Sequence, residues 1–331
     1  MRQTVIAALV FASFGTLAAA QTSAPTAAID PSAVAITQPV KGSDIPVRLM
    51  YVPMYDGVYS PIGLRTPAGP GPFPIVVFAS GNGGGGMPVI IEETQNQSWT
   101  QEQFLKAGYA VAWMRYRAEI ELGYNKFGKM LSGNRQGRQL LNRAPLDYED
   151  VIAIIKFVKT LPYIDANRVG YMGMSHGGEM AFKITSEYHD LKAAVASEPA
   201  NHEFLSLTPD NTATVTKATG MRDIESMLMR ETDKARGRID LKLSQERIAT
   251  ITTPIFVQGR DTDELQGIFR VGYDLLAEAK KDAIWKTYDH AVHGFVYVKR
   301  DKAGVYAPDP IQLTAVKDSI EFFDKYMKAG K

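Results

Sequence analysis

The hydrophobic positions of the chain fall into short continuous runs that are rich in β-branched residues. The run at residues 74–79 reads Pro-Ile-Val-Val-Phe-Ala, and similar runs recur at 109–114, 168–172, 192–196, 254–257 and 284–288. A run without polar alternation is typical of a strand that is buried on both faces of a parallel sheet. The pattern therefore predicts at least six such strands.

Segments with helical spacing lie between most of these runs. Two apolar stripes follow the i, i+3, i+4, i+7 spacing or one close to it: Val151, Ile154, Ile155, Val158 and Val316, Ile320, Phe323, Met327. Strands that alternate with helices predict an α/β fold with a mainly parallel sheet and helices on both faces. Before this region, 47–51 and 60–65 flank the turn signal Asp56-Gly57 and predict an antiparallel hairpin.

One interval breaks the alternation. About fifty residues, 201–252, separate two predicted strands, which is far more than an ordinary crossover needs. The segment includes a helix-like stretch at 221–229. Because it leaves the sheet at the carboxyl side, where ligands bind in such folds, we interpret it as a helical lid; a surface excursion without a role in binding is the alternative.

The N-terminus has the pattern of a secretory signal peptide. Residues 1–20 carry one arginine, a short apolar core and the small-residue end Ala18-Ala19-Ala20. We expect a signal peptide over 1–20, a flexible lead-in over 21–45, and one α/β domain over 46–331. The chain has no cysteine. Export without disulfides fits a periplasmic or secreted protein with a large core.

The net charge of the chain argues against a nucleic-acid partner. The 37 basic and 36 acidic residues give a net charge of +1, whereas a nucleic-acid partner normally requires a basic patch. Past the N-terminus no apolar stretch is long enough to span a membrane, so we expect no membrane span in the mature protein. The oligomeric state is left open.

The stretch Gly173-Met174-Ser175-His176-Gly177 follows an apolar strand and precedes a helical pattern. A serine hydroxyl is a poor nucleophile, so an enzyme must hold it exposed on a tight strand-to-helix turn beside a base and backbone amides. The two glycines leave room for that turn. We therefore predict a nucleophile elbow with Ser175 as the nucleophile.

A base for Ser175 must come from one of five histidines. His176 belongs to the turn itself, and His189 is expected to be a solvated residue at a helix end. His293 is the preferred base, because it follows the last predicted strand and the adjoining glycine lets its loop reach the sheet edge. His290 lies in the same loop, and His202 is a secondary candidate.

The orienting acid is expected after the strand at 254–257. Asp261 lies at its carboxyl end, and the order Ser175, Asp261, His293 is the one expected with this kind of elbow. We choose Asp261, although it could instead pair with Arg260. Asp263 is the open alternative, although with Gln266 it matches an N-cap and capping box, which is a competing structural explanation for that residue.

The glycine-rich loop 81–86 follows the strand at 74–79. It lacks the Gly-Lys-Ser/Thr of a phosphate loop and the acidic residue of a dinucleotide site, so we assign it to the oxyanion hole. The expected donors are the backbone N–H groups of His176 and Asn82. The chemistry requires no metal and no cofactor.

Together these motifs resemble the α/β-hydrolase superfamily, and within it the dienelactone hydrolases and prolyl oligopeptidase-like serine hydrolases. The resemblance rests on segments 52–58, 147–151 and 165–170, on the elbow, and on 293–295. It implies a Ser-His-Asp esterase or peptidase with an α/β-hydrolase fold.

The chain departs from the pattern of these relatives in several places. Ser80 precedes the first loop glycine where relatives often have histidine, and a serine replaces the cysteine nucleophile of dienelactone hydrolases. Gly259 and Asp261 are one residue closer together than the usual glycine and acid of the family, which keeps Asp263 open. The short N-terminal region has no room for the β-propeller of full-length prolyl oligopeptidases.

We therefore expect an exported serine hydrolase that cleaves small carboxylic esters through an acyl-enzyme. A peptidase for short peptides and a non-catalytic binding protein are the alternatives. Arg115 and Arg117 could bind a substrate carboxylate, but pairing with Glu119 and Glu121 is favoured.

Overall fold

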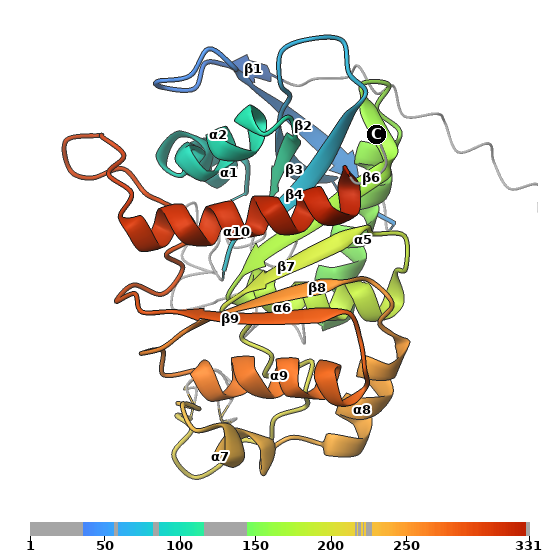
Figure 1. The fold of residues 1–331 in the computed structure, drawn as a ribbon, viewed down its shortest axis with the longest axis vertical. Coiled ribbons are helices and arrows are strands. Elements are labelled where there is room, and N and C mark those ends of the chain that lie inside the picture. The colour runs from blue at the N-terminus through green and yellow to red at the C-terminus, as the bar shows by residue number, and fades with distance from the viewer. Residues whose placement is uncertain are drawn as a thin grey trace, which may run out of the picture. The chain divides into compact units, whose positions relative to one another are not determined.

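The apolar runs of the sequence form one mixed β-sheet in the computed structural model of the protein (Figure 1). The structure describes residues 36–55, 59–81, 86–115, 144–215, 217, 220, 222 and 227–328. In these ranges the sheet has nine strands in the order β1-β2-β3-β5-β4-β6-β7-β8-β9. Their bounds are β1 Ile36–Gln38, β2 Val47–Pro53, β3 Tyr59–Arg65, β4 Phe73–Ala79, β5 Ala110–Met114, β6 Ile164–Met174, β7 Ala193–Ser197, β8 Ile255–Arg260 and β9 Ala283–Tyr288.

The two halves of the sheet differ in strand direction. From β1 to β5 the neighbouring strands are antiparallel, and from β5 through β4, β6, β7 and β8 to β9 they are parallel. The predicted hairpin is present as β2 and β3, while its turn residues Asp56 and Gly57 lie outside the described ranges. The parallel half brings the carboxyl ends of β4, β6, β7 and β8 to one edge.

Helices cover both faces of the sheet, as the alternation predicted. One apolar layer contains buried residues of α1 (Gly86–Asn96), α2 (Ser98–Lys106) and α10 (Pro310–Met327). The other contains buried residues of α5 (Ala144–Lys159), α6 (His176–Glu187), α8 (Leu241–Thr250) and α9 (Gln266–Glu278). A short helix, α7 (Thr232–Arg236), packs against α9. This is the α/β-hydrolase architecture that the sequence predicted.

Strand β4 shows why the continuous apolar runs were informative. Ile75 and Val77 belong to the layer under α5 and α6, whereas Val76 and Phe78 belong to the layer under α2 and α10. All four are fully buried. Because successive strand side chains point to opposite faces, a strand covered on both sides requires apolar residues at every position.

The first strand lies in a segment that the sequence analysis assigned to a flexible lead-in. Residues 36–38 pair antiparallel with Gln38 opposite Val47, and Val40 is buried. Residues 36–38 of the predicted 21–45 lead-in thus form a strand, which the sequence did not indicate because an edge strand of three residues has no clear hydrophobic period. Residues 1–35, including the predicted signal peptide, lie outside the described ranges.

The segment 201–252 contributes to the helical layer. Helix α8 packs against α6 and α9, so this part of the segment completes the cover of the sheet. In the stretch predicted as a helix over 221–229, residues 227–229 have no helical structure; 221 and 223–226 lie outside the described residues. Met227 and Met229 are nevertheless buried. A lid role for this segment stays a prediction.

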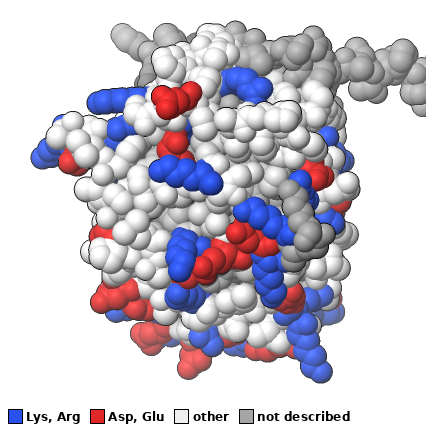
Figure 2. All heavy atoms as spheres, turned by 45° about the horizontal axis from the view of Figure 1, so that its top comes forward, with Lys and Arg blue, Asp and Glu red and all other residues white. Residues whose placement is uncertain are grey.

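Surface charge follows the balanced composition. On the face drawn in Figure 2, basic and acidic side chains are interspersed. Among the described residues, no helix combines the length and the apolar character that crossing a membrane would require.

Candidate active site

Ser175 is held in a strained turn between β6 and α6. Its backbone has φ 58° and ψ −115°, a left-handed conformation that is rare for a residue with a side chain. The Ser175 N–H donates to the carbonyl of Ser197, and its own carbonyl accepts from the N–H groups of Glu179 and Ala200. These bonds hold the turn, and the serine stays only half-buried. Strain of this kind is concentrated at functional sites.

The glycines of the turn are required by close backbone approach. A Cβ atom at Gly173 would lie 2.0 Å from the carbonyl oxygen of Gly177, inside any allowed contact. A Cβ at Gly178 would lie 2.7 Å from the carbonyl oxygen of Ser197, at the end of β7. The first helical turn of α6 is therefore pressed against both neighbouring strand ends, which fits the predicted need for glycine at position 173 and adds a second such position at Gly178.

The histidine loop after β9 lies against the same turn. Gly294 has φ 81°, and a Cβ there would come within 2.8 Å of Met174, the residue before Ser175. Further along, the hydroxyl of buried Tyr297 lies 3.0 Å from the carbonyl oxygen of Ala79 and 3.1 Å from that of Met172. The loop that carries His293 is thus fastened to β4 and β6.

The structure brings Asp263 to His293, and not Asp261. The Nδ1 atom of His293 lies 2.7 Å from Oδ2 of Asp263. Asp261 is exposed, and its carboxylate accepts a hydrogen bond from the hydroxyl of Thr287 on β9. Our choice of Asp261 as the orienting acid therefore disagrees with the geometry, and the open alternative, Asp263, occupies that place.

A tight turn after β8 explains why Asp263, and not Asp261, reaches His293. The Asp263 N–H donates to the carbonyl of Arg260, so the chain reverses and directs Asp261 to the β9 side. The capping-box interpretation of Asp263 and Gln266 is wrong. Helix α9 has Leu265 at its N-cap, and the Gln266 side chain accepts from the Arg260 N–H instead.

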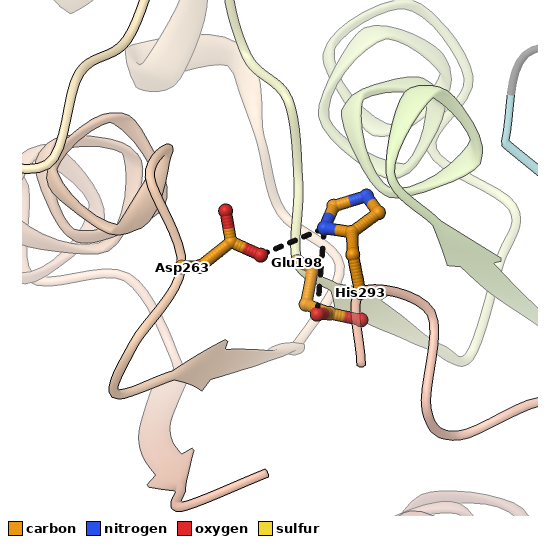
Figure 3. A group of neighbouring side chains, drawn as sticks. All are labelled: Glu198, Asp263 and His293. Atoms are coloured by element: carbon orange, nitrogen blue, oxygen red, sulfur yellow. Dashed lines mark hydrogen bonds and ion pairs between the residues drawn. The ribbon is translucent and has the colours of Figure 1, made fainter. Parts of the chain in front are cut away.

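Arg260 connects the acid loop to the histidine loop. Its guanidinium donates to Oδ2 of Asp263 at 2.8 Å and to the carbonyls of His290 and Ala291 at 3.1 Å. A second acid, Glu198, lies on the other side, with Oε1 3.3 Å from the Arg260 guanidinium and 3.5 Å from Nδ1 of His293. Figure 3 shows both acids directed at the same ring nitrogen. The sequence analysis did not select Glu198, because a buried acid after an apolar strand has no motif of its own.

The charges around His293 set its protonation. Burial by itself would raise the pKa of Asp263, but the hydrogen bond from His293 and the nearby charges hold that pKa below its ordinary value. Burial would lower the pKa of His293, and the Asp263 hydrogen bond and the Glu198 charge raise it overall. Because an ionised carboxylate only accepts, Nδ1 carries the proton and Nε2 is the basic atom.

Glu198, Asp263 and His293 could also be considered as metal ligands, since their ligand atoms lie within 4.8 Å of one another. The Arg260 guanidinium, however, already binds Asp263 and lies beside Glu198. A fixed positive charge at that place opposes a bound cation. The cluster is better suited to stabilising an imidazolium ion.

The expected oxyanion donors lie at the start of α6 and after β4. His176 is the first residue of α6, where backbone N–H groups lack an intrahelical acceptor, and its ring faces Glu179. A Cβ at Gly81 would lie 3.2 Å from Cβ of Ser175, so the glycine-rich loop begins beside the serine. Asn82, the second expected donor, lies outside the described residues.

Buried Arg115 contacts Ser80, the residue that precedes this loop. Its guanidinium donates to the hydroxyl of Ser80 and lies 3.2 Å from the carboxylate of Glu93. Arg115 thus forms an ion pair with Glu93; Arg117, Glu119 and Glu121 lie outside the described residues.

Another buried acid, Glu179, anchors the segment after β7. Its carboxylate accepts from the backbone N–H groups of Glu203 and Phe204 at 2.7 and 2.8 Å, and it lies 3.5 Å from Lys183. Burial would raise the pKa of Glu179, but the charges of Lys183 and His176 and the hydrogen bonds hold it well below the ordinary value.

The remaining histidines have other partners. The buried ring of His202 lies 3.0 Å through Nδ1 from the carbonyl of Ala200. His290 lies 2.9 Å from the carboxylate of Asp309 and stacks on Phe295. His189 is exposed at the end of α6. His293 thus differs from these three histidines, because it combines a hydrogen bond to a buried acid with a place in the loop that lies against the serine turn.

Comparisons with known proteins agree with this architecture. The sequence profile of the prolyl oligopeptidase family matches residues 95–226, which include the serine turn but not Asp263 or His293. No curated protein matched the chain by sequence.

Several solved structures share the fold. An acylaminoacyl peptidase from Pyrococcus horikoshii is 17% identical with a TM-score of 0.58, and the match covers 88% of this chain but 43% of that one. An esterase from Rhizomucor miehei is 15% identical with a TM-score of 0.57, covering 88% of this chain and 87% of that one. A thermostable carboxylesterase from a metagenomic library is 16% identical with a TM-score of 0.55, with coverage of 88% and 91%.

This chain therefore spans less than half the length of the peptidase and most of the length of the two esterases. Together, these comparisons show that the chain has the α/β-hydrolase fold and that its segment 95–226 is similar to the prolyl oligopeptidase family.

Proposed function

We propose that the protein is an exported serine hydrolase that cleaves small carboxylic esters. The observation that carries the proposal is the hydrogen bond of 2.7 Å between His293 and buried Asp263, in a loop fastened beside the strained Ser175. A nucleophile, a base and an orienting acid on one sheet edge are the parts that acyl transfer needs.

We propose the following steps for these groups. Ser175 Oγ attacks the ester carbonyl while Nε2 of His293 takes its proton. The backbone N–H of His176, with a donor from the loop after β4, stabilises the oxyanion. The imidazolium returns the proton to the leaving alcohol, and water then releases the acid by the same route. Asp263 keeps the Nδ1 proton in place throughout.

The test uses purified protein with short-chain nitrophenyl esters and a fluorophosphonate probe. We expect ester turnover, labelling at Ser175, and a loss of at least about 10⁴-fold in kcat/KM for Ser175→Ala. Ser186→Ala, a serine in the last turn of α6, is the matched control and should retain activity. A protein that neither turns over esters nor reacts with the probe would refute the proposal.

A peptidase is the second candidate, because the matching profile is that of the prolyl oligopeptidase family. The same triad can hydrolyse esters and amides, so a comparison of substrates is needed to tell an esterase from a peptidase. The methyl ester and the amide of one acylated amino acid should be compared. Our proposal expects a much larger kcat/KM for the ester; an amide hydrolysed equally well would favour the peptidase.

Export is a part of the proposal that rests on the sequence of residues 1–20. Expression of the full chain in a Gram-negative host should give a periplasmic or secreted product that begins at Gln21. N-terminal sequencing of the fractionated protein tests this, and an uncleaved cytoplasmic product would contradict it.

A further inference from the structure

Glu198 lies beside His293, but the Ser-His-Asp mechanism proposed above gives it no role. It follows β7 directly, is fully buried, and its Oε2 accepts a hydrogen bond from the Gly294 N–H at 2.7 Å. The glutamate therefore holds the residue next to His293. Its other oxygen, Oε1, lies 3.5 Å from Nδ1 of His293.

The backbone of Glu198 is strained to reach this place. Its φ is 47°, in the left-handed region that side chains rarely adopt, and its N–H is fixed to the carbonyl of Gln258 at 2.7 Å. Ser175 shares this left-handed conformation, and the two residues are joined through Ser197, whose carbonyl accepts from the Ser175 N–H. Strain at two neighbouring positions directs both side chains to one edge.

Oε1 lies 3.3 Å from the Arg260 guanidinium but is left without a hydrogen bond in the part of the chain that the structure describes. Among the described residues no donor forms a hydrogen bond to it, although it is fully buried and lies near the charges of Arg260 and His293. A carboxylate needed only to anchor the loop would have both oxygens satisfied, since an unsatisfied buried oxygen is costly.

We propose that Glu198 is a second positioning acid for His293, which anchors the histidine loop through Oε2 and shares the Nδ1 proton of the imidazolium with Asp263 through Oε1. The inference deepens the proposed function and rests on it. When His293 takes the Ser175 proton, its positive charge faces two carboxylates, and no proton passes to Glu198. If Asp263 is removed, Glu198 is the acceptor left beside Nδ1.

The charged groups that face Glu198 are His293, Asp263 and Arg260. Burial raises the pKa of Glu198 to about 7, against the lowering effect of the His293 charge and the Gly294 hydrogen bond. Because Oε1 of Glu198 lies 3.5 Å from Nδ1 of His293, the two groups are expected to influence each other's titration.

The first experiment follows the titration of His293 by NMR in the wild type and in Glu198→Gln, with His293→Gln to assign the signal. The substitution removes the negative charge but keeps an oxygen for Gly294. We expect the pKa of His293 to fall by about one unit. Glu179→Gln, which alters a buried acid that does not contact His293, is the control and should leave this pKa unchanged.

This readout needs no turnover, so it separates the inference from the proposed function. An inactive wild type would refute the ester-hydrolase proposal without deciding about Glu198. An unchanged pKa of His293 in folded Glu198→Gln would refute the role of Glu198 even in a fully active enzyme. If Glu198→Gln does not fold, Glu198→Asp withdraws the carboxylate by one methylene and should shift the same pKa in the same direction.

The second experiment is a double-mutant cycle on kcat/KM. Asp263→Ala should keep residual activity that depends on Glu198, so adding Glu198→Gln should lower it on the order of ten-fold further. The acid limb of the single Glu198→Gln profile should move to lower pH with the pKa of His293. Equal activity of Asp263→Ala and the double variant, or an unmoved acid limb, would overturn the assignment.

Discussion

Two fully buried glutamates flank the serine turn, and they differ in almost everything except burial. Glu179 is surrounded by Lys183, His176 and two backbone amides, and its pKa is far below the ordinary value. Only one carboxylate oxygen of Glu198 accepts a backbone hydrogen bond, and the nearby Arg260 also forms an ion pair with Asp263. The pKa of Glu198 is raised to about 7. Burial alone thus does not decide what an acid does; its partners do.

The comparison separates a structural acid from a reactive cluster. Glu179 is ionised at neutral pH and binds the chain after β7 to α6. Glu198 and His293, together with the ionised Asp263, form a group whose charges interact around one ring nitrogen. Four substitutions or conditions test this division.

The largest effect is expected in the reactive cluster. Asp263→Asn should lower kcat/KM by about 10⁴-fold, because an amide can donate to Nδ1 and stabilise the wrong tautomer of His293. Steady-state kinetics on a short-chain ester measures it, with circular dichroism to confirm folding. A folded Asp263→Asn variant with activity close to wild type would remove Asp263 from the site.

The next largest effect concerns the structural acid. Glu179→Ala leaves the backbone N–H groups of Glu203 and Phe204 without their buried acceptor and removes one of the two carboxylates beside Lys183, so it should cost about 3 kcal/mol of unfolding free energy. Urea denaturation provides the measurement. If this variant were as stable as the wild type, Glu179 would not be the anchor that we describe.

The pH dependence of stability should have opposite signs for the two acids. Glu198 is raised in the fold, so its contribution is complete below the unfolded value of 4.5 and is lost as pH rises through about 7. Glu179 is lowered, so its contribution is present above 4.5 and is lost as pH falls through its folded pKa.

His293, which is also raised, adds to the loss at higher pH. Glu198→Gln removes the contribution of Glu198 to this pH dependence. Between pH 5 and pH 8, the unfolding free energy of the variant should therefore fall less than that of the wild type, by up to about 3 kcal/mol. Urea titrations at both pH values test this, and equal losses would contradict the raised pKa.

The smallest effect is expected for the acid that the sequence first suggested. Asp261 is exposed and bonded to Thr287, so Asp261→Asn should leave kcat/KM within about two-fold of wild type. Measured beside Asp263→Asn, it gives a direct comparison of two acids two residues apart. A large loss for Asp261→Asn alone would reverse our assignment.

The sequence predicted most of the fold, the serine turn and the histidine, but not the acid. Strand β4 and the serine turn were predictable because their requirements are local: apolar residues at every position, and glycine where a Cβ of Gly173 would meet Gly177. His293 was selected from the order of the motifs, and the structure places it next to an acid.

The acid loop could not be resolved in this way. Asp261 and Asp263 are chemically alike and two residues apart, and the choice depends on where Arg260 directs its guanidinium after the chain reverses. Glu198 was missed because its role comes from the packing of β7 beside the histidine loop. Long-range contacts of this kind leave no pattern within a short window of sequence.

The phenol of Tyr297 has a consequence for motion. Because it is hydrogen-bonded between the ends of β4 and β6, and lies four residues after His293, the histidine loop cannot lift without breaking a buried contact in the centre of the sheet. Backbone amides at 295–298 should therefore exchange with solvent as slowly as those of the central strands. Substrate would then enter a site whose base is already in place, and the moving parts of the cycle must be sought elsewhere in the protein.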